Sequence, residues 1–209
     1  MEHSESLYPK LKSFIDSLNT SQISEQRKQE LLPLIESIQD NRTYNKPLEL
    51  VFICTHNSRR SVLAQVWAQT LSYYFKQPYI HCYSGGTEAT SVYPMIIKVL
   101  AECGLKIAVN GKYSNSNFSI SYAANVPSIA VFSKRFDDAQ NPSQEFLAIM
   151  TCSHADQNCP FVAGAIKRFT LTYEDPKIYD ETTKEKENYN IRNYQIATEM
   201  KFIFSKINI

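Results

Sequence analysis

An apolar run ends in a cysteine at position 54, and an arginine and a serine follow at positions 60 and 61. Residues 48–53 are mostly apolar and partly β-branched, which predicts a buried strand. After Ser61, apolar side chains recur at helical spacing, which predicts a helix; they are Val62, Leu63, Val66, Trp67 and Leu71. The chain must therefore adopt a fold in which one short loop joins a buried strand to a helix N-terminus.

The residues of this loop are suited to binding an oxyanion. A short loop that opens a helix presents successive backbone N–H groups to an anion, and the helix N-terminus adds partial positive charge. The guanidinium of Arg60 can hold two oxygens at once, and the same field favours a nucleophilic thiolate at Cys54. We predict an oxyanion-binding loop of Thr55, His56, Asn57, Ser58, Arg59, Arg60 and Ser61. The competing interpretation is a buried structural cysteine beside a chance arginine.

Strand and helix patterns alternate along the rest of the chain. Short apolar runs predict strands at residues 79–84, 128–132, 146–150 and 167–171. Helical patterns cover residues 94–103 and continue from residue 190 to near the end. This alternation predicts an α/β fold with a parallel sheet flanked by helices on both faces.

The N-terminal part has a different pattern. Apolar residues recur at helical spacing in two segments before residue 46, and the second segment contains Pro33. Residues 41–47 are polar and turn-rich, as in a linker. We therefore predict a helical extension over residues 1–45 and a catalytic domain over residues 46–209.

Composition argues against several classes of function. The net charge of +1 predicts no general affinity for nucleic acid or anionic membranes. Polar residues interrupt every apolar run, and the first residues lack the profile of a signal peptide. Five cysteines are too few and of the wrong parity for a secreted disulfide framework. We therefore expect a cytoplasmic protein with reduced thiols, of which Cys82 and Cys103 are packing residues.

A second pair of cysteines follows the strand predicted at residues 146–150. Cys152 and Cys159 are separated by six residues, which is wider than the usual spacing of zinc ligands, and His154 is the one nearby partner. The pair is therefore interpreted as redox-active, with a metal site and inert thiols as alternatives.

Over residues 48–209 the chain resembles the low-molecular-weight tyrosine phosphatase superfamily, and within it the thioredoxin-coupled arsenate reductases. The loop matches theirs at Cys54, Thr55, Asn57, Ser58, Arg60 and Ser61. The second motif matches at Cys152, Ser153, Ala155, Asp156, Asn158, Cys159 and Pro160. His56 and Arg59 depart from the loop pattern, and His154 and Gln157 depart from the second motif.

The departures in the loop carry expectations of their own. His56 stands where the family usually has glycine, so an unusual backbone conformation is expected there. Arg59 stands where the family usually has a second cysteine. Its side chain is expected either to attract anions at the rim or to be solvated on the first helical turn.

The resemblance implies a three-cysteine relay. Cys54 attacks arsenate, Cys152 attacks Cys54 and releases arsenite, and Cys159 attacks Cys152 through a mobile segment and carries the disulfide to thioredoxin. Asp175, in an Asp-Pro pair, corresponds to the general acid of the superfamily.

No tightly bound cofactor is implied. In some reductases, residues that match Asn57 and Ser84 hold a potassium ion together with a glutamate. Gln65 replaces that glutamate here, so the resemblance gives little support to a potassium site.

Two other functions remain open at this level. A tyrosine phosphatase, which hydrolyses phosphate esters, needs only Cys54, Arg60 and Asp175, so both activities can coexist. The third possibility is an oxyanion-binding or redox-sensing module with little turnover.

Overall fold

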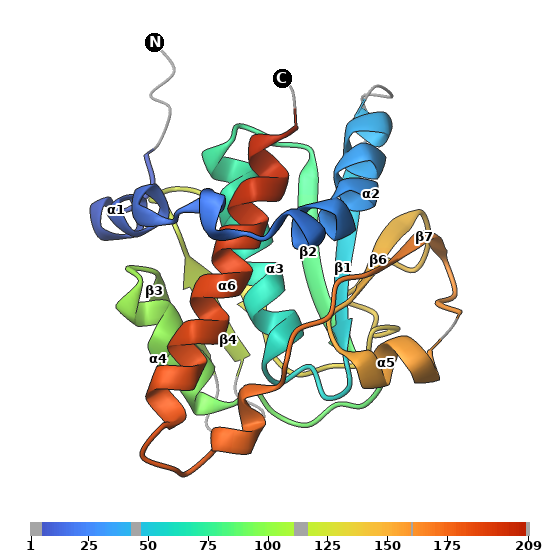
Figure 1. Cartoon of the computed structure of the whole chain (residues 1–209). Helices are drawn as coiled ribbons and strands as arrows, with labels where there is room; N and C mark the ends of the chain where they lie inside the picture. Colours follow the sequence, from blue (N-terminus) through green and yellow to red (C-terminus); the bar gives the residue numbers. More distant parts are fainter. Residues whose placement is uncertain (1–5, 43–46, 111–116, 160, 208–209) are drawn as a thin grey trace.

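Four parallel strands form the main sheet of the computed structural model, in the order β2-β1-β6-β7 (Figure 1). The structure describes residues 6–42, 47–110, 117–159 and 161–207. The strands are β1 (Leu48–Cys54), β2 (Ile80–Gly86), β6 (Phe146–Met150) and β7 (Ala165–Thr170). They confirm the strands predicted at residues 48–53, 79–84, 146–150 and 167–171, and with them the α/β fold.

Strand β1 lies in the middle of the sheet and is buried on both faces, as its nearly continuous apolar sequence requires. Leu50 and Phe52 face the larger core, and Val51 and Ile53 face a smaller one. Ile53 pairs with Gly85 on one side and with Met150 on the other. The ends of β1, β2 and β6 therefore meet at one edge of the sheet, directly before the loops that follow them.

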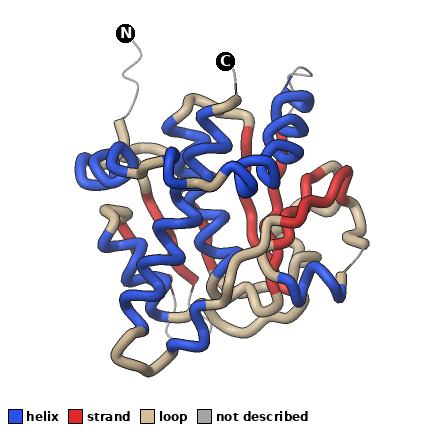
Figure 2. The backbone as a smooth tube through the Cα atoms, viewed as in Figure 1, coloured by secondary structure: helices blue, strands red, loops and turns tan. Residues whose placement is uncertain are grey.

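Helices α3 (Arg60–Tyr74) and α6 (Glu185–Ser205) pack against each other over one face of this sheet. Figure 2 shows the strands of the main sheet to the right of these two helices. Helix α4 (Pro94–Glu102) confirms the helix predicted at residues 94–103, and α6 begins five residues before the predicted start at residue 190. On the other face, α5 (Ser153–Asn158) contributes Ala155 to the smaller core.

A second sheet lies beside the first and was not predicted. It is antiparallel, with the order β3-β4-β5, and consists of β3 (Lys106–Asn110), β4 (Asn117–Ser121) and β5 (Ile129–Val131). The strand predicted at residues 128–132 is β5, but it pairs with β4 instead of joining the parallel sheet. Strand β3 is largely exposed and β4 is partly buried, with Ile120 in the core, so neither has the long buried apolar run of β1.

The predicted N-terminal helical extension is present as α1 (Pro9–Ser17), the 3₁₀ turn η1 (Thr20–Gln22) and α2 (Glu25–Arg42). Phe14 stacks on Trp67 of α3 with ring centroids 5.3 Å apart, and Arg27 forms a 2.9 Å ion pair with Glu199 of α6. The extension therefore shares its core with the main sheet. Pro33 lies inside α2, and the boundary predicted at residue 45 falls outside the described residues.

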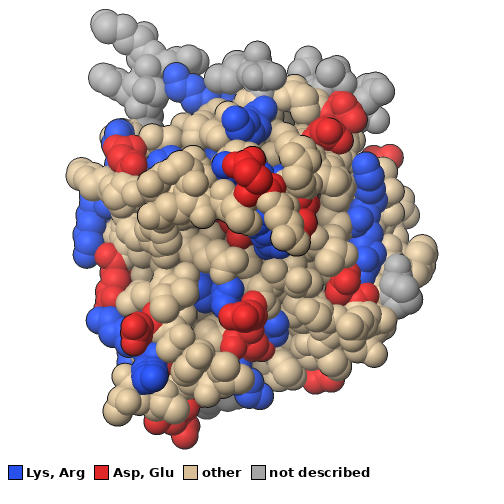
Figure 3. Space-filling view, viewed as in Figure 1, with Lys and Arg blue, Asp and Glu red and all other residues tan. Residues whose placement is uncertain are grey.

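Figure 3 shows basic and acidic side chains interspersed on the face that carries α6. Among the helices that the structure describes, none is both long enough and apolar enough to cross a membrane.

Candidate active site

The predicted oxyanion loop runs from Cys54, at the end of β1, to Arg60, at the start of α3. Two backbone N–H groups that follow β2 hold it: that of Thr87 donates to Cys54 O at 3.0 Å, and that of Glu88 donates to Thr55 O at 2.8 Å. This close approach requires Gly86, because a Cβ there would lie 2.3 Å from Glu88 O and 2.7 Å from Thr55 O.

The tight curve of the loop is made at Asn57, which has a φ of 46°. The expectation of an unusual conformation at His56 is wrong, because the left-handed residue is its neighbour, and asparagine tolerates that conformation well. His56 keeps ordinary backbone geometry, and its ring lies 3.7 Å from the carboxylate of Glu88.

Cys54 lies at the base of the loop and is 3% exposed. Its sulfur is 3.1 Å from Ser61 Oγ, which also accepts a 2.9 Å hydrogen bond from Asn57 Nδ2. Because Asn57 already donates to that oxygen, the hydroxyl proton of Ser61 is free to point at the sulfur. A donor in this position supports a thiolate, which is the nucleophilic form of cysteine.

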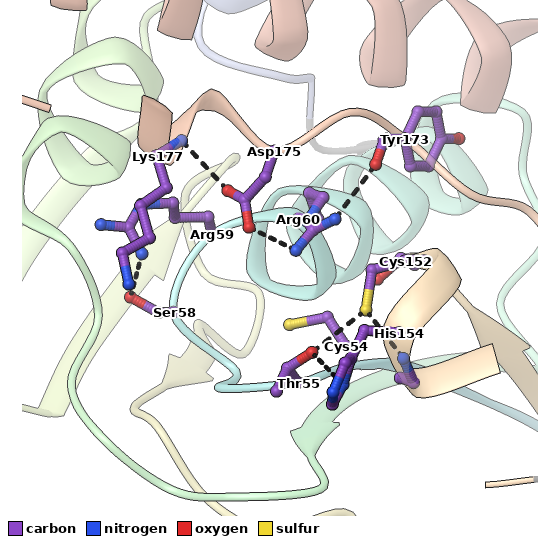
Figure 4. Close-up of polar contacts among 12 residues, drawn as sticks. Cys54, Thr55, Ser58, Arg59, Arg60, Cys152, His154, Tyr173, Asp175 and Lys177 are labelled. Atoms are coloured by element: carbon purple, nitrogen blue, oxygen red, sulfur yellow. Dashed lines mark hydrogen bonds and ion pairs between the residues drawn. The ribbon is translucent and has the colours of Figure 1, made fainter. Parts of the chain in front are cut away.

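The predicted clamp, Arg60, lies next to the predicted acid, Asp175 (Figure 4). Arg60 Nη2 donates to Asp175 Oδ2 at 2.5 Å, and Nη1 donates to Tyr173 O at 3.1 Å. Its Nε is buried and has no hydrogen-bond partner among the described residues. A buried N–H that lacks an acceptor is costly, so this donor favours an anion beside it.

Cys152 lies two residues after the end of β6, and Cys54 is the last residue of the neighbouring strand β1. The N–H of Thr151 donates to Ile53 O at 2.7 Å, and both cysteines belong to the smaller core. Cys152 is fully buried and forms the N-cap of α5, where its sulfur accepts from Ala155 N at 3.3 Å. Cys159 ends the same helix and is partly exposed, and all five cysteines are free thiols. The segment expected to be mobile thus forms a short helix, and Pro160 lies outside the described residues.

The arrangement can be compared with known proteins at this point. No protein-family model matches the chain. Its sequence is 29% identical to an arsenate reductase of Staphylococcus epidermidis over 127 residues, which are 61% of this chain and 77% of the relative. It is 28% identical to an arsenate reductase of Bacillus cereus, over 61% of this chain and 75% of the relative.

Two solved structures match the fold at a TM-score of 0.50. An arsenate reductase in its oxidized state is 19% identical and covers 77% of this chain and 98% of its own. A low-molecular-weight phosphotyrosine phosphatase of Vibrio cholerae is 12% identical and covers 76% of this chain and 94% of its own. The chain has the low-molecular-weight phosphatase fold. The resemblance to this superfamily and to its arsenate reductases is confirmed. The proteins found in both comparisons are enzymes, which agrees with the prediction that this chain is an enzyme.

Arg59 has a role in this phosphatase fold that the sequence analysis missed. Its side chain is buried, so both expectations for Arg59, a solvated side chain and a free charge at the rim of the loop, are wrong. The guanidinium lies 4.2 Å above the ring of Tyr93, forms an ion pair with Asp180, and donates from Nε to the hydroxyl of Tyr189 at 2.5 Å. Asp180 closes η2 (Pro176–Tyr179), the turn that Asp175 opens. Arg59 therefore ties the loop to the segment that carries the predicted acid.

His154 is the second residue whose role sequence reasoning missed, since it was considered only as a possible metal partner of the cysteine pair and as a departure from the reductase pattern. Its Nδ1 lies 3.3 Å from Thr55 Oγ1, and that oxygen lies 3.4 Å from the sulfur of Cys152. Figure 4 shows the three side chains side by side next to Cys54. The sequence did mark this position, because His154 differs from the family residue within an otherwise matching motif. It gave no indication that His154 contacts Thr55.

The three residues that correspond to potassium ligands in some reductases are bonded to protein groups. Asn57 Oδ1 accepts from the N–H of Lys134 at 3.0 Å, and Ser84 Oγ donates to Gln65 Oε1 at 2.6 Å. In the part of the chain that the structure describes, no three His, Cys, Asp or Glu side chains lie close enough together to hold a metal ion.

Burial shifts the pKa values of two further side chains, that of Lys134, whose backbone N–H contacts Asn57 of the loop, and that of Cys103, which lies outside the loop. Burial lowers the pKa of Lys134, whose ammonium lies 4.5 Å from the centre of the Phe132 ring, to about 8. Burial also raises the pKa of Cys103 to about 11. Cys82 and Cys103 are both buried, which confirms them as packing residues.

Proposed function

We propose that the chain is an arsenate reductase that uses Cys54, Cys152 and Cys159 in sequence and is recycled by thioredoxin in the cytoplasm. The observation that carries the proposal is the position of Cys152, which follows the strand next to β1 and shares a core with Cys54. The sequence similarity to arsenate reductases supports it. A phosphatase has no need of a second thiol at this place.

In the first step, the Cys54 thiolate attacks the arsenic of arsenate, and one arsenate oxygen leaves as water. The backbone N–H groups of the loop and the side chain of Arg60 hold the remaining oxygens. The buried Nε of Arg60 is the donor available for one of them. Asp175, fixed beside Arg60, supplies a proton to the leaving oxygen.

In the second step, the Cys152 thiolate attacks the sulfur of Cys54. An S–S bond forms, the S–As bond breaks, and its electron pair stays on arsenic, which leaves as arsenite. Cys159 then attacks Cys152, so the disulfide moves to a partly exposed residue that a thioredoxin can reduce. This last step requires α5 to open, because the two cysteines lie at its opposite ends.

Tyrosine phosphatase activity is the second candidate, because Cys54, Arg60 and Asp175 lie together and suffice for it. The third possibility is an oxyanion-binding or redox-sensing module, in which the loop binds the anion but catalyses little or no reaction.

The deciding experiment measures arsenate-dependent NADPH oxidation in the presence of thioredoxin and its reductase. The wild type should oxidise NADPH when arsenate is added, and the Cys152→Ser and Cys159→Ser variants should not. Cys103→Ala is the matched control, since Cys103 is a buried thiol outside the loop and should be dispensable.

Each alternative gives a different result in the same assay. A wild type that hydrolyses an aryl phosphate but shows no arsenate-dependent turnover is a phosphatase, and Cys152→Ser should then keep that activity. A wild type that binds phosphate without either activity is an oxyanion-binding module.

A further inference from the structure

A continuous line of polar contacts leads from the buried Cys152 to solvent (Figure 4). The sulfur of Cys152, which is 0% exposed, lies 3.4 Å from Thr55 Oγ1. Thr55 is also buried, and its Oγ1 lies 3.3 Å from Nδ1 of His154, a residue on the exposed side of α5. The line therefore begins at a thiol and ends at an imidazole that can exchange protons with water.

The hydrogen-bonding capacity of each group determines the direction in which protons are donated along this line. The sulfur of Cys152 already accepts a 3.3 Å hydrogen bond from Ala155 N, so its proton is available to Thr55. A hydroxyl can accept one proton and donate its own, which makes Thr55 a donor to His154. This assignment requires the neutral tautomer of His154 with a free lone pair on Nδ1.

The proposed reaction needs such a path. Cys152 attacks Cys54 only as a thiolate, and because it is fully buried, water cannot reach the sulfur to take its proton. We propose that His154, acting through the hydroxyl of Thr55, removes the proton from Cys152. This inference rests on the proposed role of Cys152 as the attacking thiol.

The transfer balances as a simple relay. The S–H bond of Cys152 breaks while an O–H bond forms at Thr55, and the original O–H bond of Thr55 breaks while an N–H bond forms at Nδ1 of His154. The freed electron pair on Cys152 forms the S–S bond with Cys54. The imidazolium then releases its proton to water.

The charged groups around the relay come from several elements, and each already has a partner. On α5 itself, Asp156 pairs with Arg168 of β7 at 2.5 Å. After β2, Glu88 lies 3.7 Å from His56. Among the described residues on the neighbouring elements, Arg60 is paired with Asp175 and Arg135 with Asp137. The thiols of Cys54 and Cys159 and the phenol of Tyr83 are further titratable groups of the smaller core that packs against α5. His154 is thus the group in contact with Thr55 that can accept a proton near neutral pH.

The experiment follows the Cys152 step without arsenate. In a full-length Cys159→Ser chain, an aromatic disulfide reagent reacts first with Cys54 and releases one coloured thiolate. Cys152 then attacks the mixed disulfide on Cys54 and releases a second thiolate. Stopped-flow absorbance resolves the two phases, and each is recorded as a function of pH.

The second phase should become faster as the pH is raised, because the imidazole of His154 must be neutral to accept the proton. In a His154→Gln variant of the same chain, it should be about tenfold slower or more at neutral pH. Its midpoint should move to higher pH, because Cys152 then has to lose its proton without the imidazole. Thr55→Val should behave like His154→Gln, and Thr55→Ser should restore the second phase because it keeps the hydroxyl.

Two internal comparisons keep the result specific. The first phase should be unchanged in His154→Gln, which shows that the chain is folded and that Cys54 is intact. His81→Gln changes an exposed histidine of β2 and should leave both phases unchanged. A second phase with the wild-type rate and midpoint in His154→Gln would overturn the relay while leaving the proposed function in place. A Cys159→Ser chain with no second phase overturns the proposed function and the relay together.

Discussion

Arg59 and Tyr189 are 130 residues apart in the chain, yet Arg59 Nε donates a 2.5 Å hydrogen bond to the hydroxyl of Tyr189. Tyr189 in turn donates to Asp180 Oδ1, also at 2.5 Å, and Asp180 is ion-paired with the same guanidinium. Three elements, the start of α3, the end of η2 and the first half of α6, are thus bound at one point. The predicted acid at Asp175 and the loop cannot move apart unless this cluster breaks.

Replacing Arg59 with alanine should lower the free energy of unfolding by about 3 kcal/mol, because it leaves Asp180 without its cation in a largely buried position. Urea denaturation followed by circular dichroism measures the change. Arg135→Ala is the control, since its ion pair with Asp137 is more than half exposed on both sides and should matter little. Equal losses in the two variants would contradict the structural role of Arg59.

Replacing Gly86 with alanine should weaken the binding of inorganic phosphate to the loop by about tenfold or more. The added Cβ would lie 2.8 Å from the N–H of Asn57 and closer still to the carbonyls of Thr55 and Glu88, so the loop has to shift. Calorimetric titration with phosphate measures the affinity. Gly85→Ala meets the backbone of Phe136 at 2.3 Å instead, so it should destabilise the chain while keeping most of the phosphate affinity.

Replacing Lys134 with methionine should stabilise the chain at neutral pH. Burial lowers the pKa of Lys134 from 10.5 to about 8, which corresponds to a penalty of about 3 kcal/mol in the folded state. Between these two pH values the folded chain binds fewer protons at Lys134 than the unfolded chain, so wild-type stability rises with pH there. The penalty is complete below about pH 8 and absent above 10.5.

The stability gain of Lys134→Met over wild type should therefore be largest at pH 7 and small near pH 10. Denaturation curves of both proteins at the two pH values test this, and comparing them cancels the titration of other groups. A methionine variant that is less stable than wild type at both pH values would contradict the prediction.

Removing the side chain of Arg168 should loosen α5. Arg168 Nη2 donates to Asp156 at 2.5 Å and Nε donates to Cys159 O at 3.2 Å, so one side chain of β7 holds both the middle and the end of the helix. In Arg168→Ala, backbone amides of residues 153–158 should exchange with deuterium about tenfold faster or more. Peptides from β1 serve as the internal reference and should be unchanged.

The sequence was informative wherever a structure depends on neighbours in the chain. The apolar run of β1, the helical spacing of α3 and the spacing from Cys54 to Arg60 are all local, and together they predicted the loop. The placement of Asp175 beside Arg60 could be anticipated only through the resemblance, because 115 residues separate them.

Other features depend on contacts that no local pattern records. Strands β3 and β4 are short and at most partly buried, and they exist because β4 pairs with β3 on one side and with β5 on the other. Arg59 is buried because partners from three distant segments surround it, whereas its type alone predicts an exposed side chain. The contact between His154 and Thr55 spans 99 residues and depends on β6 lying next to β1.

Helix α5 separates two cysteines that the proposed reaction must join. A helix of this length holds its ends about 10 Å apart, whereas a disulfide requires Cα atoms within about 7 Å. Under the proposed function, each catalytic cycle would therefore contain a cycle of local unfolding and refolding. Substitutions that stabilise α5 would then slow the catalytic cycle. Consensus or helix-strengthening substitutions at residues 153–158 are therefore a poor choice for engineering a faster enzyme.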